Sequence, residues 1–153
     1  MRISTRVIYG LRAMCVLGLH YGRGPLSVAR IAEMEKISFP YLEQLLNRLR
    51  KEGLVKSLRG AKGGYTLTKP PREITVAHIV QALEGTVYAR LFSWNGHDHQ
   101  RSASPTAVVV AGMWERLQET TVAFLERLTL QDLLEETKDA SVASIDHRFT
   151  FHI

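Results

Sequence analysis

The chain has 153 residues, a formal net charge of +5 and 45% apolar residues, enough for one domain with a hydrophobic core. No apolar run is long enough to span a bilayer, and charges scattered through the first residues exclude a signal peptide, so we expect a soluble cytoplasmic protein. The single cysteine, Cys15, excludes a disulfide framework and a multi-cysteine metal site within one chain, and we interpret it as a small buried side chain.

Positive charge is concentrated in the first part of the chain. Residues 1–85 hold fourteen Lys or Arg and six Asp or Glu, whereas residues 86–153 hold six and nine. A basic region beside an acidic one favours a polyanionic partner such as DNA, although a basic surface without any ligand is also common.

Three helices are predicted over the first fifty residues. Ser4 can cap a helix that starts near Thr5 and ends near Tyr21, and Ser27 can cap a short second helix. Ser38 can cap the third, which ends near residue 51. Because the third helix is amphipathic and basic and follows the second after a tight turn, the pair is typical of a helix-turn-helix.

A two-stranded hairpin is predicted directly after the third helix. Residues 54–58 and 65–68 alternate in polarity, and the tip between them, RGAKGG, is basic and rich in glycine. A hairpin in this place is a wing. The tip lacks the spacing of a Walker motif, and a strand follows it, so a nucleotide-phosphate loop is disfavoured. Thr75 can cap a fourth helix, which Gly85 ends.

The remaining chain is predicted to hold a loop, a long helix and a short acidic helix. Residues 86–105 are polar and without period, which predicts a long surface loop. From about 106 to 128, apolar residues recur at alternating four- and three-residue steps. Such a helix usually lies against a twin from another chain; the alternative is packing against its own domain. The proposed dimerisation positions are Val110, Met113, Trp114, Leu117, Thr121, Phe124 and Leu128.

These patterns predict a mainly α fold, a winged helix-turn-helix with a long C-terminal dimerisation helix. We expect a DNA-binding domain over residues 1–85 and a sensor-type loop over 86–105. The dimerisation helix and a short last helix occupy 106–138, and a tail occupies 139–153.

The third helix and the wing hold the candidate DNA contacts. The major groove accepts one helix, whose first turns meet base edges. There Gln44 can pair with adenine and Glu43 can accept from cytosine, while Arg48 is better placed for phosphate. The alternative is that the basic residues of this helix form only a solvated face. The candidate DNA-binding residues are Arg2, Ser38, Phe39, Pro40, Tyr41, Glu43, Gln44, Arg48, Lys51, Arg59, Gly60, Lys62, Gly63 and Gly64.

Other chemistry has weak support. His97, Asp98 and His99 are candidate metal ligands, but His-x-His in a loop is a weak signal, and exposed side chains explain it more simply. Trp94 lies in the same loop, where it can cover the loop base or an inducer site. No nucleophile motif or Ser-His-Asp set is visible, so we do not expect an enzyme.

Several stretches resemble the Rrf-two family of bacterial winged-helix transcriptional regulators. They are MRIST, SFPYLEQLLNRLRKEGLVKSLRGAKGGYTL, VAHIVQALEG, and WERL followed by TLQDLL, and the resemblance covers residues 1 to about 136. It implies a homodimer with crossed long helices that binds palindromic operator DNA. It also implies that Ser38, Tyr41, Glu43, Gln44, Arg59 and the wing glycines occupy DNA-contacting positions.

The resemblance also locates where members of the family bind a two-iron two-sulfur cluster. Those members carry three cysteines before the long helix and a histidine within it. The position of the last cysteine is Val108 here, Ser102 lies six residues earlier, and the histidine position is Ala111. We therefore expect no cofactor of this kind. Either the chain senses another signal, or the ligand residues have been replaced in this sequence.

The sequence thus supports a sequence-specific DNA-binding regulator that acts as a homodimer on operator DNA, with a small-molecule effector or protein partner at the 86–105 loop. Two alternatives stay open. One is a winged-helix module that binds a protein through its acidic part. The other is a metal or cluster sensor that uses His97, Asp98 and His99. Whether the protein activates or represses is not visible in the sequence.

Overall fold

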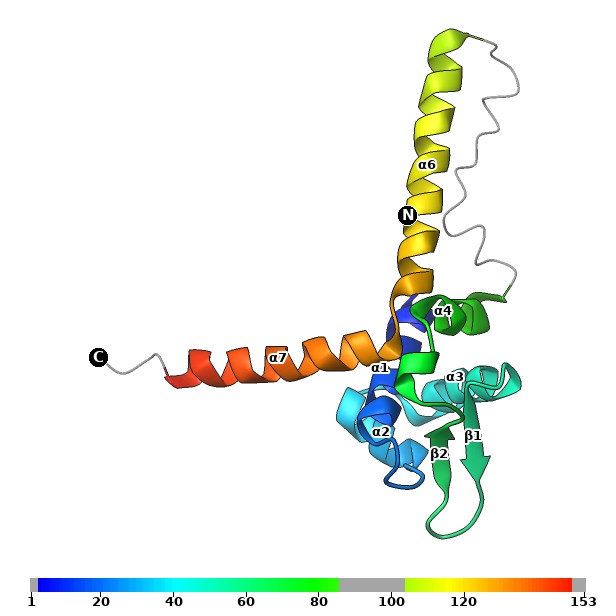
Figure 1. The fold of residues 1–153 in the computed structure, drawn as a ribbon. Helices are drawn as coiled ribbons and strands as arrows, with labels where there is room; N and C mark the ends of the chain where they lie inside the picture. Colours follow the sequence, from blue (N-terminus) through cyan, green and yellow to red (C-terminus); the bar gives the residue numbers. More distant parts are fainter. Residues whose placement is uncertain (1–2, 86–103, 150–153) are drawn as a thin grey trace.

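The computed structural model describes residues 3–85 and 104–149. A body of short helices and a hairpin carries two long helices, one standing upright and one extending sideways (Figure 1). In chain order the elements are α1 (Thr5–Leu19), α2 (Val28–Glu35), α3 (Phe39–Lys51), β1 (Val55–Leu58), β2 (Gly64–Leu67), the 3-10 turn η1 (Pro71–Glu73), α4 (Val76–Glu84), α6 (Pro105–Arg127) and α7 (Leu130–Phe149). The mainly α fold with a winged helix-turn-helix is confirmed.

Local capping sets where most helices begin. The Ser4, Ser27 and Thr75 side chains each accept a hydrogen bond from a backbone N–H in the first turn of the helix that follows. Ser104 does the same for α6. Ser38 also occupies an N-cap position, but its hydroxyl makes no capping bond to α3. Its backbone role was predicted correctly, and its side chain keeps its hydrogen-bonding capacity for another partner.

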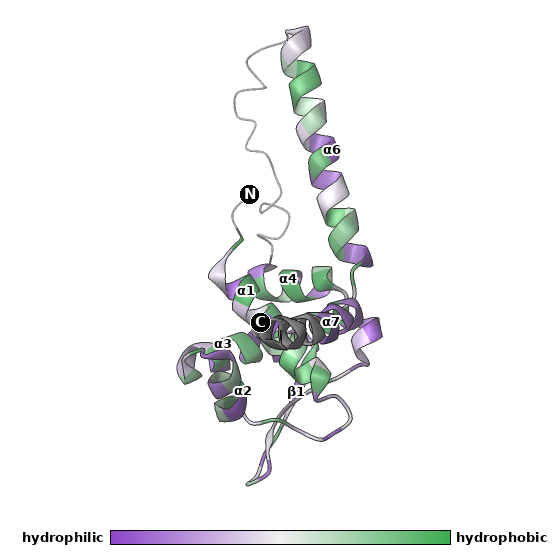
Figure 2. Cartoon of the chain, turned by 90° about the vertical axis from the view of Figure 1, so that its left-hand side faces the viewer, coloured by the Kyte–Doolittle hydropathy of each residue, from purple (hydrophilic) through white to green (hydrophobic). Residues whose placement is uncertain are grey.

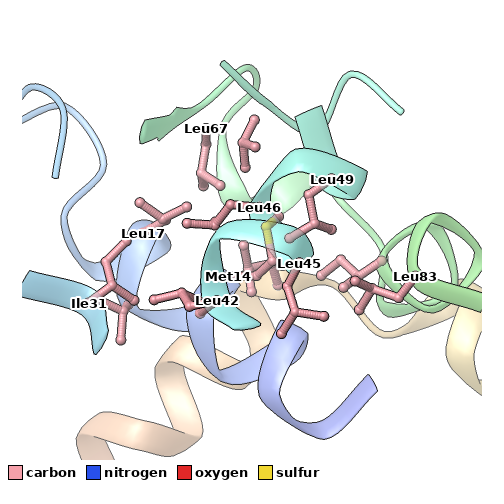
Figure 3. Close-up of a cluster of buried hydrophobic side chains, with 14 of the residues drawn as sticks. Met14, Leu17, Ile31, Leu42, Leu45, Leu46, Leu49, Leu67 and Leu83 are labelled. Carbon is pink, nitrogen blue, oxygen red and sulfur yellow. The ribbon is translucent and has the colours of Figure 1, made fainter. Parts of the chain in front are cut away.

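The core of the body lies beneath α3. Its apolar face, Leu42, Leu45, Leu46 and Leu49, is at most 1% exposed. Figure 3 shows these leucines among residues of α1, α2, α4 and the hairpin. Burying each one contributes about 1.5–3 kcal/mol relative to leaving it in water, so α3 is held rigidly by its own chain. The opposite face of the helix is left to solvent.

The helices α1 and α4 pack closely where they cross. A side chain at Gly10 would bring its Cβ within 2.2 Å of Leu83 Cδ1, closer than atoms of neighbouring residues can pack. Glycine therefore lets α4 lie directly against α1, and this contact brings the end of α4 close to the start of α1.

The wing is attached to the body by more than its own two strands. β1 and β2 are antiparallel, with Val55 opposite Leu67 and Leu58 opposite Gly64. Leu26, before α2, exchanges two 2.9 Å backbone hydrogen bonds with Tyr65 in β2. No pattern in the sequence indicated this bridge. It lies so close to the hairpin that a Cβ at Gly64 would be 2.2 Å from the Leu26 carbonyl oxygen.

The helix α6 follows its predicted range closely and leaves the body for most of its length. Near its lower end, Leu125 and Leu128 pack against a small cluster of Val7, Val76 and Val80. No residue of α6, which is described from end to end, is buried. Figure 2 shows that hydrophobic residues recur along the upright helix, between hydrophilic ones. The alternative of packing along its own domain therefore holds for the lower end alone.

The last helix differs from the prediction. A short helix and a tail from residue 139 were expected, whereas α7 continues to Phe149. Leu130 and Leu134 are buried against the body, but residues 135–140 are exposed. The sequence from 130 to 149 holds no glycine or proline, so helix propensity can continue without an apolar stripe that would reveal it. Within the described residues, no helix is both long and apolar enough to cross a membrane.

Candidate nucleic-acid interface

The helix α3 lies next to the strands of the wing (Figure 1), and the residues of its first turns that do not face the core are exposed. Ser38, Pro40, Glu43 and Gln44 are all exposed, and Phe39 is 46% exposed despite its apolar ring. Since the leucines of the same helix face the core, these side chains point away from the body. They supply hydroxyl, carboxylate and amide groups, which are the groups that bond base edges and phosphates in a major groove.

Tyr41 has a structural role that the sequence did not reveal. Its ring is half-buried and packs edge-on against Tyr9 of α1, with ring centroids 6.0 Å apart and planes at 85°. The Arg12 guanidinium lies over the other ring, 5.3 Å from the Tyr9 centroid, and pairs with Glu35 at 2.7 Å. This chain of contacts fixes the edge of α3 relative to α1 and α2.

The basic residues of α3 do not share one environment. Lys51 is exposed, as expected for a phosphate contact. Arg48 is also exposed, but its Nη1 donates to the Leu83 carbonyl oxygen of α4 at 3.3 Å. Arg6 of α1 donates to the same oxygen at 3.4 Å. The structure thus brings Arg48 together with a residue that was not among the sequence candidates.

The wing tip presents its two cations on a tight turn. Arg59 and Lys62 are exposed. The N–H of Gly63 donates to the Gly60 carbonyl oxygen at 2.9 Å, and a Cβ at Gly63 would lie 2.3 Å from the Leu58 carbonyl oxygen. With Gly60 at φ +115°, a larger residue would strain the turn. The tip is therefore narrow enough to approach a sugar-phosphate backbone closely.

Five candidates from the sequence lie outside the described residues: Arg2, Trp94, His97, Asp98 and His99. The predicted loop that holds the last four falls there as well, apart from its final two residues.

The positions that the family resemblance associates with an iron–sulfur cluster do not fit one. Val108 and Ala111 lie on α6 and carry no donor atom. Cys15 lies in α1, and burial, aided by the negative charge of Glu35, raises the pKa of its thiol to about 11, which opposes the thiolate that a cluster needs. Among the described residues, no group of three His, Cys, Asp or Glu side chains is arranged to hold a metal ion.

The sequence is similar to a known protein family and to named regulators. Residues 3–136 match the Rrf2 family, described as an iron-dependent transcriptional regulator. The chain is 37% identical over 137 residues to the HTH-type transcriptional regulator CymR of Bacillus subtilis, covering 90% of this chain and 92% of the relative. It is 34% identical over 143 residues to IscR of Photorhabdus laumondii, covering 94% and 85%.

Solved structures give the same grouping. The structure of CymR, the global cysteine regulator of B. subtilis, superposes with a TM-score of 0.77 at 36% identity and covers 89% of this chain and 98% of the other. That of T. potens IscR gives 0.72 at 39% identity, covering 92% and 90%. The relatives are named as transcriptional regulators, in agreement with the expectation that this chain is not an enzyme.

Proposed function

This chain belongs to the Rrf2 family of transcriptional regulators, and we propose that it binds a palindromic operator as a homodimer without an iron–sulfur cluster. The observation that carries the proposal is the exposed edge of α3 next to a wing with a basic tip, in a chain of this family. Regulation of transcription and DNA binding follow from the family. The operator symmetry, the dimer and the absence of a cluster are the proposed parts.

The exposed apolar side of α6 supports the dimer. The α6 seam comprises the seven proposed dimerisation positions, of which Val110, Met113, Leu117 and Phe124 are 45–54% exposed. A second copy of the same helix is an apolar partner of matching length. Crossing two such helices would place the two DNA-binding domains about a two-fold axis. Domains related in this way bind a palindrome whose half-sites lie about one helical turn apart.

Reading of the operator follows from the two exposed parts of each copy. In this arrangement α3 enters the major groove, where Gln44 and Glu43 meet base edges and Ser38 bonds a base or a phosphate. The wing lies on the backbone, where Arg59 and Lys62 neutralise phosphates. Base contacts supply the sequence preference, and phosphate contacts supply most of the salt-dependent affinity.

The donor set supports a cluster-free protein. A two-iron two-sulfur cluster is held by thiolates, or by thiolates and imidazoles. Val108 and Ala111 offer neither, and Cys15 lies in a different helix with a raised pKa. We therefore assign no step of the regulation to an iron–sulfur cluster. An absorption spectrum of anaerobically purified protein tests this part, since a cluster absorbs in the visible range and a bare polypeptide does not.

Footprinting on the DNA upstream of the protein's own gene tests the proposal as a whole. Symmetric protection by the purified protein at low salt is expected. Light scattering should give the mass of two chains for the free protein, and the mass of two chains plus one duplex for the DNA complex. A lack of protection on any palindrome at low salt would instead favour a protein-interaction module. The same footprint repeated with candidate effectors identifies the signal.

A further inference from the structure

A hollow of about 260 Å³ lies between the start of α1 and the exposed edge of α3. Since one water occupies about 30 Å³ in the liquid, a hollow of this size has room for a phosphate group. We call it the α1–α3 hollow. Its walls carry hydroxyl, amide and guanidinium groups, from Ser4, Thr5, Arg6, Tyr41, Gln44 and Arg48.

The two arginines of this hollow are only partly satisfied. Arg6 and Arg48 each use Nη1 to donate to one shared acceptor, the Leu83 carbonyl oxygen, at 3.4 and 3.3 Å. A guanidinium carries five N–H donors. Apart from the ion pair of Arg6 with Glu84, the described residues offer these two groups only that one oxygen, so most of their donors are left for another acceptor. The carbonyl holds the two side chains near each other.

The local charge is positive even after the nearest carboxylate is counted. Glu84 is 3.8 Å from Arg6 Nη1 and also accepts a hydrogen bond from the Ser4 hydroxyl. Its side chain is 7% exposed, so it stabilises the inner side of the cluster. No other carboxylate among the described residues pairs with Arg6 or Arg48. Two cations against one anion leave a net attraction for a further negative group.

The position of the hollow indicates which anion reaches it. Gln44 and Tyr41 belong both to the hollow and to the edge of α3 that faces the groove. In Figure 1 the wing lies below α3, whereas α4, which holds the shared carbonyl, lies above it. A helix in a major groove about 12 Å wide has a phosphate strand on each side. The wing and the hollow therefore face different strands of the bound DNA.

We propose that Arg6 and Arg48, with the neutral donors around them, form a backbone-phosphate site that binds the operator strand on the side of α3 away from the wing. The inference rests on the proposed function, because it needs the operator bound through α3. It adds α1 to the DNA interface and gives Leu83 and Glu84 the role of positioning residues that hold the two guanidinium groups.

The test pairs protein variants with single uncharged phosphates. Arg6→Gln and Arg48→Gln each remove one charge from the hollow. The control is Lys138→Gln, which removes one charge from an exposed position of α7. Binding to the footprinted operator is measured from about 50 to about 200 mM salt, and removing one phosphate interaction should reduce the slope of log K against log salt by about 0.9. A series of operators with one methylphosphonate each is then bound to wild type and to each variant.

The expected result is one backbone position where the methylphosphonate weakens wild type and Lys138→Gln by about fivefold or more but weakens Arg6→Gln and Arg48→Gln clearly less, because each of these variants keeps only one of the two guanidinium groups. Because this comparison is made within each protein, a general loss of folding cannot imitate it. If every methylphosphonate affects all four proteins equally and their salt slopes agree, the phosphate site is refuted while operator binding stands. If wild type protects no operator at all, the proposed function itself fails.

Discussion

The helices α3 and α6 differ in the exposure of their apolar side chains. The four leucines of α3 are at most 1% exposed, whereas along α6 Val110, Leu117 and Phe124 are 45–54% exposed. The first helix is complete within one chain, so its outer face can be held rigidly against DNA. The second has apolar surface that the described part of the chain does not cover. The contrast predicts that substitutions in α3 act on one protomer, and those in α6 on assembly.

Replacement of a core residue of α3 should have the largest effect on stability. Leu46→Ala removes a fully buried side chain and should lower the free energy of unfolding by about 2–5 kcal/mol. Leu58→Ala, at a site that is 45% exposed, is the matched control and should cost less than about 1 kcal/mol. Urea unfolding at one protein concentration measures both. Equal losses would remove the contrast between buried and exposed leucines.

A charge in the α6 seam should act on assembly while the body stays folded. In the proposed dimer, Leu117→Glu buries an unpaired carboxylate, which should weaken association by about 3 kcal/mol, or about 100-fold. Sedimentation or light scattering across a dilution series measures the shift toward monomer. The control is Glu119→Gln, on the same helix but outside the seam. Unchanged association of Leu117→Glu would show that this face is not the dimer contact.

Substitutions on the DNA-facing surface should change affinity without changing stability or mass. Gln44→Ala removes a proposed base contact and should cost about 1–3 kcal/mol of operator binding, with relaxed preference at one base pair. Arg59→Ala should weaken binding to all sequences alike and reduce the salt slope by about 1. Gel shifts with operator and scrambled DNA distinguish the two. If both variants bound the operator like wild type, the reading mode would be wrong.

The smallest effect concerns Cys15 in α1. Burial raises the pKa of its thiol from 9.0 to about 11, so the folded state retains a proton that the unfolded state loses. The contribution of the protonated thiol to the free energy of unfolding is therefore fully present below pH 9 and is lost as the pH rises through 11. At pH 8 the thiolate fraction should be about 100-fold lower than in urea-unfolded protein, which alkylation rates report. Equal rates would show an accessible thiol.

Local signals in the sequence predicted most of the fold. Serine caps, apolar spacing and a glycine-rich tip each depend on neighbours a few residues away, so the helix-turn-helix and the wing were within reach. The meeting of Arg6 and Arg48 at Leu83 was not, because those contacts span 77 and 35 residues. The end of α7 was also missed, since the sequence there has no clear apolar period.

In the candidate site, too, features that depend on local sequence could be predicted, whereas contacts between distant residues could not. Exposure of Glu43 and Gln44 follows from the leucine stripe on the other side of α3, which the sequence displays directly. The packing of Tyr41 on Tyr9 depends on how two helices cross, which no local pattern encodes. The start of α3 at Ser38 was predicted correctly, but the sequence does not show that the Ser38 hydroxyl makes no capping hydrogen bond.

The bridge between Leu26 and Tyr65 limits how this protein can be re-engineered. A hairpin grafted from a relative replaces Tyr65 but not the segment before α2, and any change in its register leaves the Leu26 N–H and carbonyl without partners. The transplantable unit is therefore longer than the hairpin. It runs from residue 26 to 67 and includes the helix-turn-helix, so exchanges of DNA specificity between relatives should be cut at those two points.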